Sequence, residues 1–145
     1  MEYFSGPAPT ATHVVRLDPG DDLLVSLRDF IARAGITDGA VVSGIGTLDH
    51  CRMHMVTTTG YPPVEVFPEW TDTALELVSM QGVIADGFPH IHMTVSTKDA
   101  AVSGHLEEGC RILYLCEIVV VELGGHSLSR EPNEHGVPQL LAKNG

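Results

Sequence analysis

The sequence predicts one domain built mostly of β-strands, with a single well-defined helix. Two patterns support this prediction. Most apolar stretches alternate with polar residues or run continuously over strand lengths between turn residues, whereas residues 21–35 follow the 3.6-residue period of an α-helix. A chain of 145 residues is also long enough to bury about two-thirds of its unfolded surface in one core.

Composition narrows the class of protein. The 43% apolar and 19% charged residues are ordinary for a globular chain, and no apolar run approaches the ~20 residues of a membrane span. The N-terminus lacks the basic start and apolar core of a signal peptide, so we expect a cytoplasmic protein without membrane contacts. Three cysteines, an odd number, favour buried free thiols, with Cys110 a minor candidate for a metal ligand.

Charge argues against a polyanionic partner. The net charge is −11, from 19 acidic and 8 basic residues, and the basic residues are scattered singly along the chain. Affinity for nucleic acids depends largely on clustered Lys and Arg side chains that neutralise phosphates. We therefore expect that this chain alone does not bind nucleic acid with useful affinity.

The first elements are an arm, a strand and a helix. Residues 1–11 are rich in Pro, Gly and Ala and are expected to form a flexible arm, followed by a strand over residues 12–17. A turn then leads to a helix that Asp21 or Asp22 caps and Gly35 ends. The apolar stripe of this helix is a core face and gives no reason to invoke a cofactor.

Residues 39–56 predict a long strand whose polar face carries His50, Arg52 and His54. Its Gly-Ile-Gly segment indicates a bulge or a close backbone approach, and it lacks the third glycine and the helix of a dinucleotide-binding loop. His50 and His54 would lie about 13 Å apart along such a strand, too far to bind one ion together. We expect a solvated or interface face there.

The second half predicts a loop, several strands and a tail. Residues 57–73 should form a long irregular loop, and two roles stay open for its Trp70: the wall of a pocket or plain packing. Strands should follow at residues 74–84, around the histidines described next, and at residues 111–123, the expected central strand. A flexible tail from Gly124 ends the domain.

The main functional signal is a pair of histidines in one strand and a third after a turn. His90 and His92 alternate with Ile91, so both imidazoles point to one face about 6–7 Å apart. Residues 99–104 predict a reversal that brings His105 beside them. Three neutral imidazoles suit Zn²⁺ or a similar divalent metal and leave a fourth position open for water or substrate. The alternative is that these histidines are structural and hydrogen-bond to backbone or carboxylate groups.

Two carboxylates lie within apolar strand patterns, Glu76 between two leucines and Glu117 in the run at 111–123. A buried carboxylate must be paired, hydrogen-bonded or protonated, because an isolated charge is costly in the interior. Both are candidates for proton transfer. The alternative is that each faces outward or pairs with an arginine, since structural ion pairs mimic functional sites.

The order and spacing of these motifs resemble the plants and prokaryotes conserved domain, or PPC domain, over residues about 14–123, in its bacterial and archaeal stand-alone form without an AT-hook. The segments that carry the resemblance are Arg16–Leu23, Gly44–Leu48, Leu75–Gly82, His90–His92, Gly104–Leu106 and Glu117.

The resemblance implies an α+β fold with a mainly antiparallel sheet flanked by helices, assembled as a homotrimer. It also implies that His90, His92 and His105 form a metal-binding unit. The fold is similar to that of acetolactate decarboxylases, in which a histidine-bound zinc polarises substrate oxygens. In plants the domain accompanies AT-hooks, Arg-Gly-Arg-Pro motifs that enter the minor groove, and members are often labelled DNA-binding proteins. This chain contains no such motif.

Two functions stay open from the sequence. In the first, the chain is a metal-dependent enzyme or sensor for a small oxygen-containing molecule, and Glu76 or Glu117 transfers a proton. In the second, it is an interaction or regulatory module whose metal is structural. An open coordination position would favour the first function, and closure by four protein ligands would favour the second.

Overall fold

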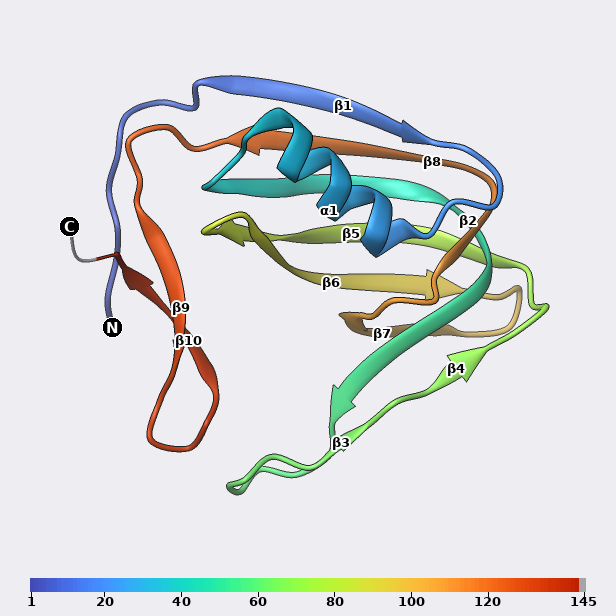
Figure 1. Cartoon of the computed structure of the whole chain (residues 1–145). Helices are drawn as coiled ribbons and strands as arrows, with labels where there is room; N and C mark the ends of the chain where they lie inside the picture. Colours follow the sequence, from blue (N-terminus) through green and yellow to red (C-terminus); the bar gives the residue numbers. More distant parts are fainter. Residues whose placement is uncertain (144–145) are drawn as a thin grey trace.

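The computed structural model describes residues 1–143 and shows a strongly curved antiparallel sheet with one helix against its inner face (Figure 1). The predicted α+β class is confirmed, with one helix rather than several in this part of the chain. In chain order the elements are β1 (Ala11–Leu17), α1 (Leu23–Ala34), β2 (Gly39–Val56), β3 (Glu65–Val66), β4 (Glu69–Trp70), β5 (Leu75–Ala85), β6 (Phe88–Ser96), β7 (Ala101–Leu106), β8 (Arg111–Glu122), β9 (Leu128–Pro132) and β10 (Pro138–Ala142).

Helix α1 forms where its end signals predicted. The Asp22 side chain accepts a hydrogen bond from the Val25 N–H at 3.0 Å and so caps the first turn. Gly35 ends the helix with φ at +69°, a left-handed conformation that glycine adopts without steric cost. The helix buries one apolar stripe against the sheet, made of Leu23, Leu24, Leu27 and Ile31.

Strand β2 is the centre of the sheet, and the prediction that residues 111–123 form the central strand is wrong. The strand order is β1-β8-β2-β5-β6-β7, so β8 lies second from the edge. The 18 residues of β2 pair with β8 on one side and β5 on the other. The prediction chose residues 111–123 because of their apolar content. The length of a strand, however, sets how many other strands it can pair with, and β2 is the longer strand.

The predicted irregularity at the Gly-Ile-Gly segment is confirmed by register shifts between β2 and β8 on both sides of Gly44 to Gly46. A side chain at Gly46 would also meet the backbone of β8. The resulting curvature lets β2 pair with a third strand, because the last residues of β2 pair with β7. Strands β2, β5, β6 and β7 therefore close part of the sheet on itself (Figure 1).

The core lies between α1 and the inner face of this sheet. On β6, Ile91, Met93 and Val95 are buried there, and strand alternation turns His90 and His92 to the opposite, outer face. The three cysteines are buried and free, as predicted. In residues 1–143 no helix is long and apolar enough to cross a membrane.

Two segments hold more structure than the sequence predicted. Within the expected loop 57–73, β3 and β4 pair with β2, and Trp70 packs against the core. The structure therefore supports the packing role for Trp70 and not the role in a pocket wall. The expected tail forms the β9–β10 hairpin, and the last two residues of that tail, 144–145, lie outside the described part.

Candidate metal centre

A row of three histidines crosses the outer face of the sheet, with one histidine from each of three neighbouring strands. His92 on β6 lies opposite His105 on β7, and His105 lies opposite His54 on β2. Directly paired residues of antiparallel strands share a face, with Cβ atoms about 4.5–5.5 Å apart. The predicted reversal between His92 and His105 is confirmed, and the row follows from strand register.

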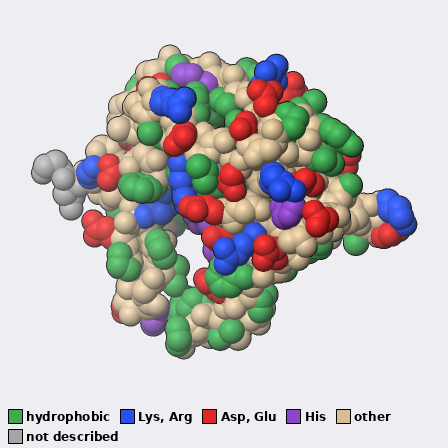
Figure 2. Space-filling view, turned by 45° about the vertical axis from the view of Figure 1, so that its right-hand side comes forward, with side chains coloured by type: hydrophobic (Ala, Val, Ile, Leu, Met, Phe, Trp, Pro, Cys, Tyr) green, Lys and Arg blue, Asp and Glu red, His purple; other side chains and the backbone are tan. Residues whose placement is uncertain are grey.

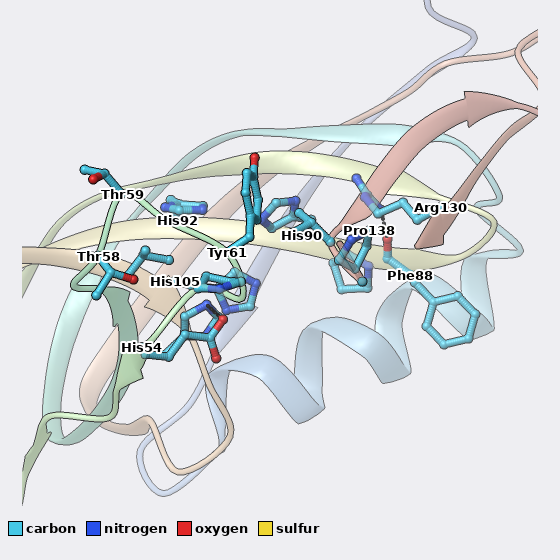
Figure 3. Close-up of a pocket in the computed structure, with 17 residues that line it drawn as sticks. His54, Thr58, Thr59, Tyr61, Phe88, His90, His92, His105, Arg130 and Pro138 are labelled. Carbon is cyan, nitrogen blue, oxygen red and sulfur yellow. Dashed lines mark hydrogen bonds and ion pairs between the residues drawn. The ribbon is translucent and has the colours of Figure 1, made fainter. Parts of the chain in front are cut away.

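His90 completes a cluster of four histidines (Figure 3). Its ring centroid lies 5.3 Å from that of His92 and 5.0 Å from that of His105, and the rings of His92 and His105 are 5.5 Å apart. The His54 ring stacks on His105 at 4.4 Å. At this spacing, side-chain rotation can bring three ring nitrogens to one ion at about 2.0–2.1 Å. The structure thus gathers the three predicted ligands, whose role as ligands stays a prediction.

Glu107 follows β7 and binds two of these histidines. Its Oε1 accepts hydrogen bonds from Nδ1 of His54 at 2.6 Å and Nδ1 of His105 at 3.1 Å. Because a carboxylate only accepts, these bonds hold the proton on Nδ1 of each ring and leave Nε2 free to bind a metal. In the described residues, His54, His105 and Glu107 also form a group whose ligand atoms all lie within 4.8 Å of one another.

The environment keeps two of these imidazoles, those of His90 and His105, neutral. Burial, followed by the positive charges of His105 and Arg130, lowers the pKa of His90 to about 4. Burial also lowers the pKa of His105, helped by His54 and opposed by Glu107. Burial acts to raise the pKa of Glu107, but hydrogen bonds and charge from His54 and His105 outweigh it and hold that pKa below its usual value. Neutral imidazoles and an ionised carboxylate are the forms that bind divalent metals.

The histidines form the floor of a cavity of about 680 Å³. Its walls come from two segments distant in sequence, the loop 57–64 after β2 and the β9–β10 hairpin. The Tyr61 ring of the loop stacks on the His135 ring of the hairpin, with centroids 3.9 Å apart. The surface is hollowed between two protruding segments (Figure 2). Figure 3 shows the Tyr61 and Arg130 side chains together with the histidines among the residues that line the cavity.

The structure does not bring Glu76 or Glu117 to this cavity. Glu76 shares the outer face of the sheet, but it lies opposite Ser96, four residues beyond His92 or roughly 13 Å along β6. Glu117 is exposed on β8, which β2 and β5 separate from β6. Their role in proton transfer stays a prediction, and Glu107 is the carboxylate that contacts the histidines.

Cys110, the minor candidate for a metal ligand, is buried away from the cavity. Its Sγ accepts a hydrogen bond from the Arg52 N–H and donates one to the Arg52 carbonyl oxygen, both at 3.3 Å. These contacts attach the start of β8 to β2. The thiol therefore has a structural role in the described chain.

Sequence reasoning missed His54 and Glu107. It compared His54 only with His50 on the same strand, because the pairing of β2 with β7 leaves no local pattern. Glu107 did have a signal. It lies two residues after His105, and side chains two apart in an extended segment share a face.

Comparisons with known proteins agree with this fold. A model of the Plants and Prokaryotes Conserved (PCC) domain matches residues 5–124. Two relatives, the bifunctional proteins GlmU of Synechococcus sp. strains JA-2-3B'a(2-13) and JA-3-3Ab, are each 27% identical over 128 and 131 residues, which is 88% of this chain. The matches cover only 19% and 20% of those proteins, so the chain spans about a fifth of their length.

Solved structures share the fold over nearly the whole chain. A metal-containing protein from Archaeoglobus fulgidus has a TM-score of 0.81 at 24% identity and covers 97% of this chain and 99% of its own. A plant- and prokaryote-conserved protein from Pyrococcus horikoshii has a TM-score of 0.79 at 24% identity, covering 98% and 99%. A protein from Bacteroides thetaiotaomicron, provisionally described as DNA-binding, has a TM-score of 0.76 at 19% identity, covering 97% and 96%.

Proposed function

The chain belongs to the Plants and Prokaryotes Conserved (PCC) domain family, and we propose that it binds zinc or a similar divalent metal and uses it to act on, or sense, a small oxygen-containing molecule. His90, His92 and His105 are the proposed ligands. The observation that carries this proposal is the cluster of four histidines at the floor of an open cavity. A histidine cluster serving only as structure would not need a cavity above it.

The donor set fits such a metal. Neutral imidazoles are preferred zinc ligands, and the Glu107 carboxylate on Nδ1 of His105 is a common second contact of a metal-bound histidine. A bound zinc would supply Lewis-acid chemistry by polarising a carbonyl or hydroxyl oxygen. His54 and Glu107, joined at 2.6 Å, are better situated than Glu76 or Glu117 to hold or move a proton in the cavity.

Metal content tests the proposal. After purification without chelator, mass spectrometry of the metals should find up to about one divalent ion per chain, as for three histidine ligands on one site. The double variant His90→Ala, His92→Ala should lose this metal. His50→Ala on β2, outside the cavity, should keep it. A wild-type protein that stays metal-free after dialysis against zinc would refute the proposal.

We further propose that the chain assembles as a homotrimer. Its sheet exposes four apolar side chains, Ile45, Val78, Tyr114 and Leu115, around one shallow depression. An exposed apolar patch on one face supports closed cyclic assembly, and the family resemblance supplies the number three. Light scattering should give about three times the 15.6 kDa of one chain, and a monomer or dimer would contradict the trimer.

The second candidate function is an interaction or regulatory module with a structural metal. The relation to about a fifth of larger bifunctional proteins favours it, because it indicates that such domains occur within longer chains. DNA is a poor partner on the basis of charge. Of the 8 basic side chains, six already lie within 4.0 Å of a carboxylate in residues 1–143, namely Arg16, Arg28, Arg33, Lys98, Arg111 and Lys143.

Fluorescence anisotropy with duplex DNA at about 50 mM salt, where phosphate contacts are strongest, tests this view. We expect no micromolar binding. Micromolar affinity that falls steeply with added salt would favour the regulatory module over the metal-dependent enzyme or sensor.

A further inference from the structure

Arg130 is the only Lys or Arg among the described residues that line the cavity. Its side chain extends from β9 to the backbone of β5 and β6. Its Nη2 donates to the Val83 carbonyl oxygen at 3.1 Å and its Nη1 to the Phe88 carbonyl oxygen at 3.2 Å. Because Val83 pairs directly with His90, these bonds hold the guanidinium on the rung of the ladder next to the histidines (Figure 3).

This cation has no counter-ion in the described part of the chain. No carboxylate lies within 4.0 Å of Arg130, although the chain carries 19 acidic residues and six other basic side chains have such a partner. The remaining one, Arg52, lies over the Phe67 ring at 5.5 Å and outside the cavity. A partly buried charge is costly without a partner, which is why burial lowers the Arg130 pKa.

The guanidinium also keeps donors free. It has five N–H groups in a planar fork, and the two backbone carbonyls occupy two of them. The others can bind a carboxylate with two parallel hydrogen bonds, a geometry that a lysine cannot reproduce. Among the described residues that line the cavity, the acidic one, Glu65, lies near His54 Nε2, at 3.9 Å, and not within 4.0 Å of Arg130.

We propose that Arg130 anchors the carboxylate of a small 2-hydroxy or 2-oxo acid, whose adjacent oxygen reaches the metal held by the histidines. The proposal rests on the proposed function and gives it a substrate class. Arg130 and the proposed ligand His90 both lie at the Val83–His90 rung of β5 and β6, so a carboxylate on the guanidinium and an oxygen on the neighbouring carbon would lie beside each other there. The rest of the ligand would contact apolar residues that line the cavity, such as Val56, Phe88 and Pro138.

Isothermal titration calorimetry of the zinc-loaded chain tests the anchor with 2-hydroxyisovalerate and its uncharged amide. The acid and the amide have nearly the same shape and the same hydroxyl, so their difference measures the carboxylate contact. We expect the acid to bind at least 10-fold more tightly than the amide. In Arg130→Gln this preference should vanish, whereas Arg52→Gln, the matched cation outside the cavity, should keep it.

Zinc content, measured for every sample, separates the two proposals. If the wild type holds no zinc, the proposed function fails. If the wild type holds zinc and binds acid and amide equally, or binds neither, the Arg130 anchor is refuted while the metal site stands. An acid preference that persists in Arg130→Gln also refutes it. Because equal binding of acid and amide by the wild type would by itself refute the anchor, the proposal stays falsifiable even if Arg130→Gln does not fold.

Discussion

The floor and the walls of the cavity are built in different ways. The floor consists of β2, β6 and β7, whose histidines are fixed by ladder pairs and whose other face packs into the core. The walls are the loop 57–64 and the β9–β10 hairpin, which contact each other and the floor through isolated interactions. Examples are the Tyr61–His135 stack and the two bonds of Arg130.

From this difference we expect the floor to hold the metal ligands and the walls to control access to the cavity. Ligands on strands with a packed underside hold their geometry, and segments with few buried contacts open at low free-energy cost. We therefore expect floor substitutions to change global stability or metal affinity, and wall substitutions to change ligand binding or local opening. The following predictions, from the largest expected effect to the smallest, test that contrast.

Ile91→Ala should have the largest effect, because it removes core packing directly beneath the floor. Ile91 lies between His90 and His92 and is 1% exposed. Truncation of a buried isoleucine costs about 2–5 kcal/mol, measurable as a lower midpoint in urea unfolding. Phe88→Ala on the same strand is the control, since Phe88 is 71% exposed and should change stability by less than about 0.5 kcal/mol. Equal losses of stability in both variants would show that core packing beneath the floor does not determine the stability of that strand.

Gly82→Ala on β5, the strand that pairs with β6 of the floor, should destabilise the protein by about 1–3 kcal/mol through overpacking. A Cβ at Gly82 would collide with the backbone carbonyl oxygen of His90, and backbone cannot move aside as a side chain can. Gly60→Ala in the wall loop is the control, because nothing lies within 4 Å of its Cβ position. If chemical denaturation shows Gly82→Ala to be as stable as Gly60→Ala, the close approach of β5 and β6 is not required.

Glu107→Gln should weaken zinc affinity 10- to 100-fold, the usual effect of losing a hydrogen-bonded partner of a ligating histidine. One Glu107 oxygen accepts from both His54 and His105, and an amide cannot supply the same negative charge. Competition with a chromophoric chelator measures the affinity. The neighbouring Glu108, which pairs with Arg28, provides the control Glu108→Gln. Unchanged affinity in Glu107→Gln would remove Glu107 from the site.

The same contrast between floor and walls separates what the sequence predicted from what it did not. The alternation of His90, Ile91 and His92 is a local pattern with period two, so the face of each side chain could be derived. The turn before His105 was equally local. The family resemblance supplied the fold class, and the structure and the family model confirm it.

Two of the missed residues, His54 and Arg130, depend on contacts between distant segments. His54 joins the cluster only because a curved β2 pairs with β7, 51 positions later at His105. Arg130 belongs to a hairpin that the sequence presented as a polar tail, and its role depends on where that hairpin docks. Glu76 and Glu117 stood out because they interrupt apolar runs, but strand alternation turns both away from the core to the outer surface.

Tyr61→Ala should have the smallest effect and should be confined to the walls. Tyr61 is 64% exposed, and its stack on His135 is worth about 0.5–1.5 kcal/mol locally, so zinc content and the urea midpoint should barely change. Because the stack joins the loop to the hairpin, its loss should speed amide hydrogen exchange in residues 57–64 and 133–137. Tyr114→Ala, also exposed at 68% but outside the cavity, should leave that exchange unchanged. Lower zinc affinity in Tyr61→Ala would show that metal binding by the floor depends on the walls, and it would contradict the expected separation of their roles.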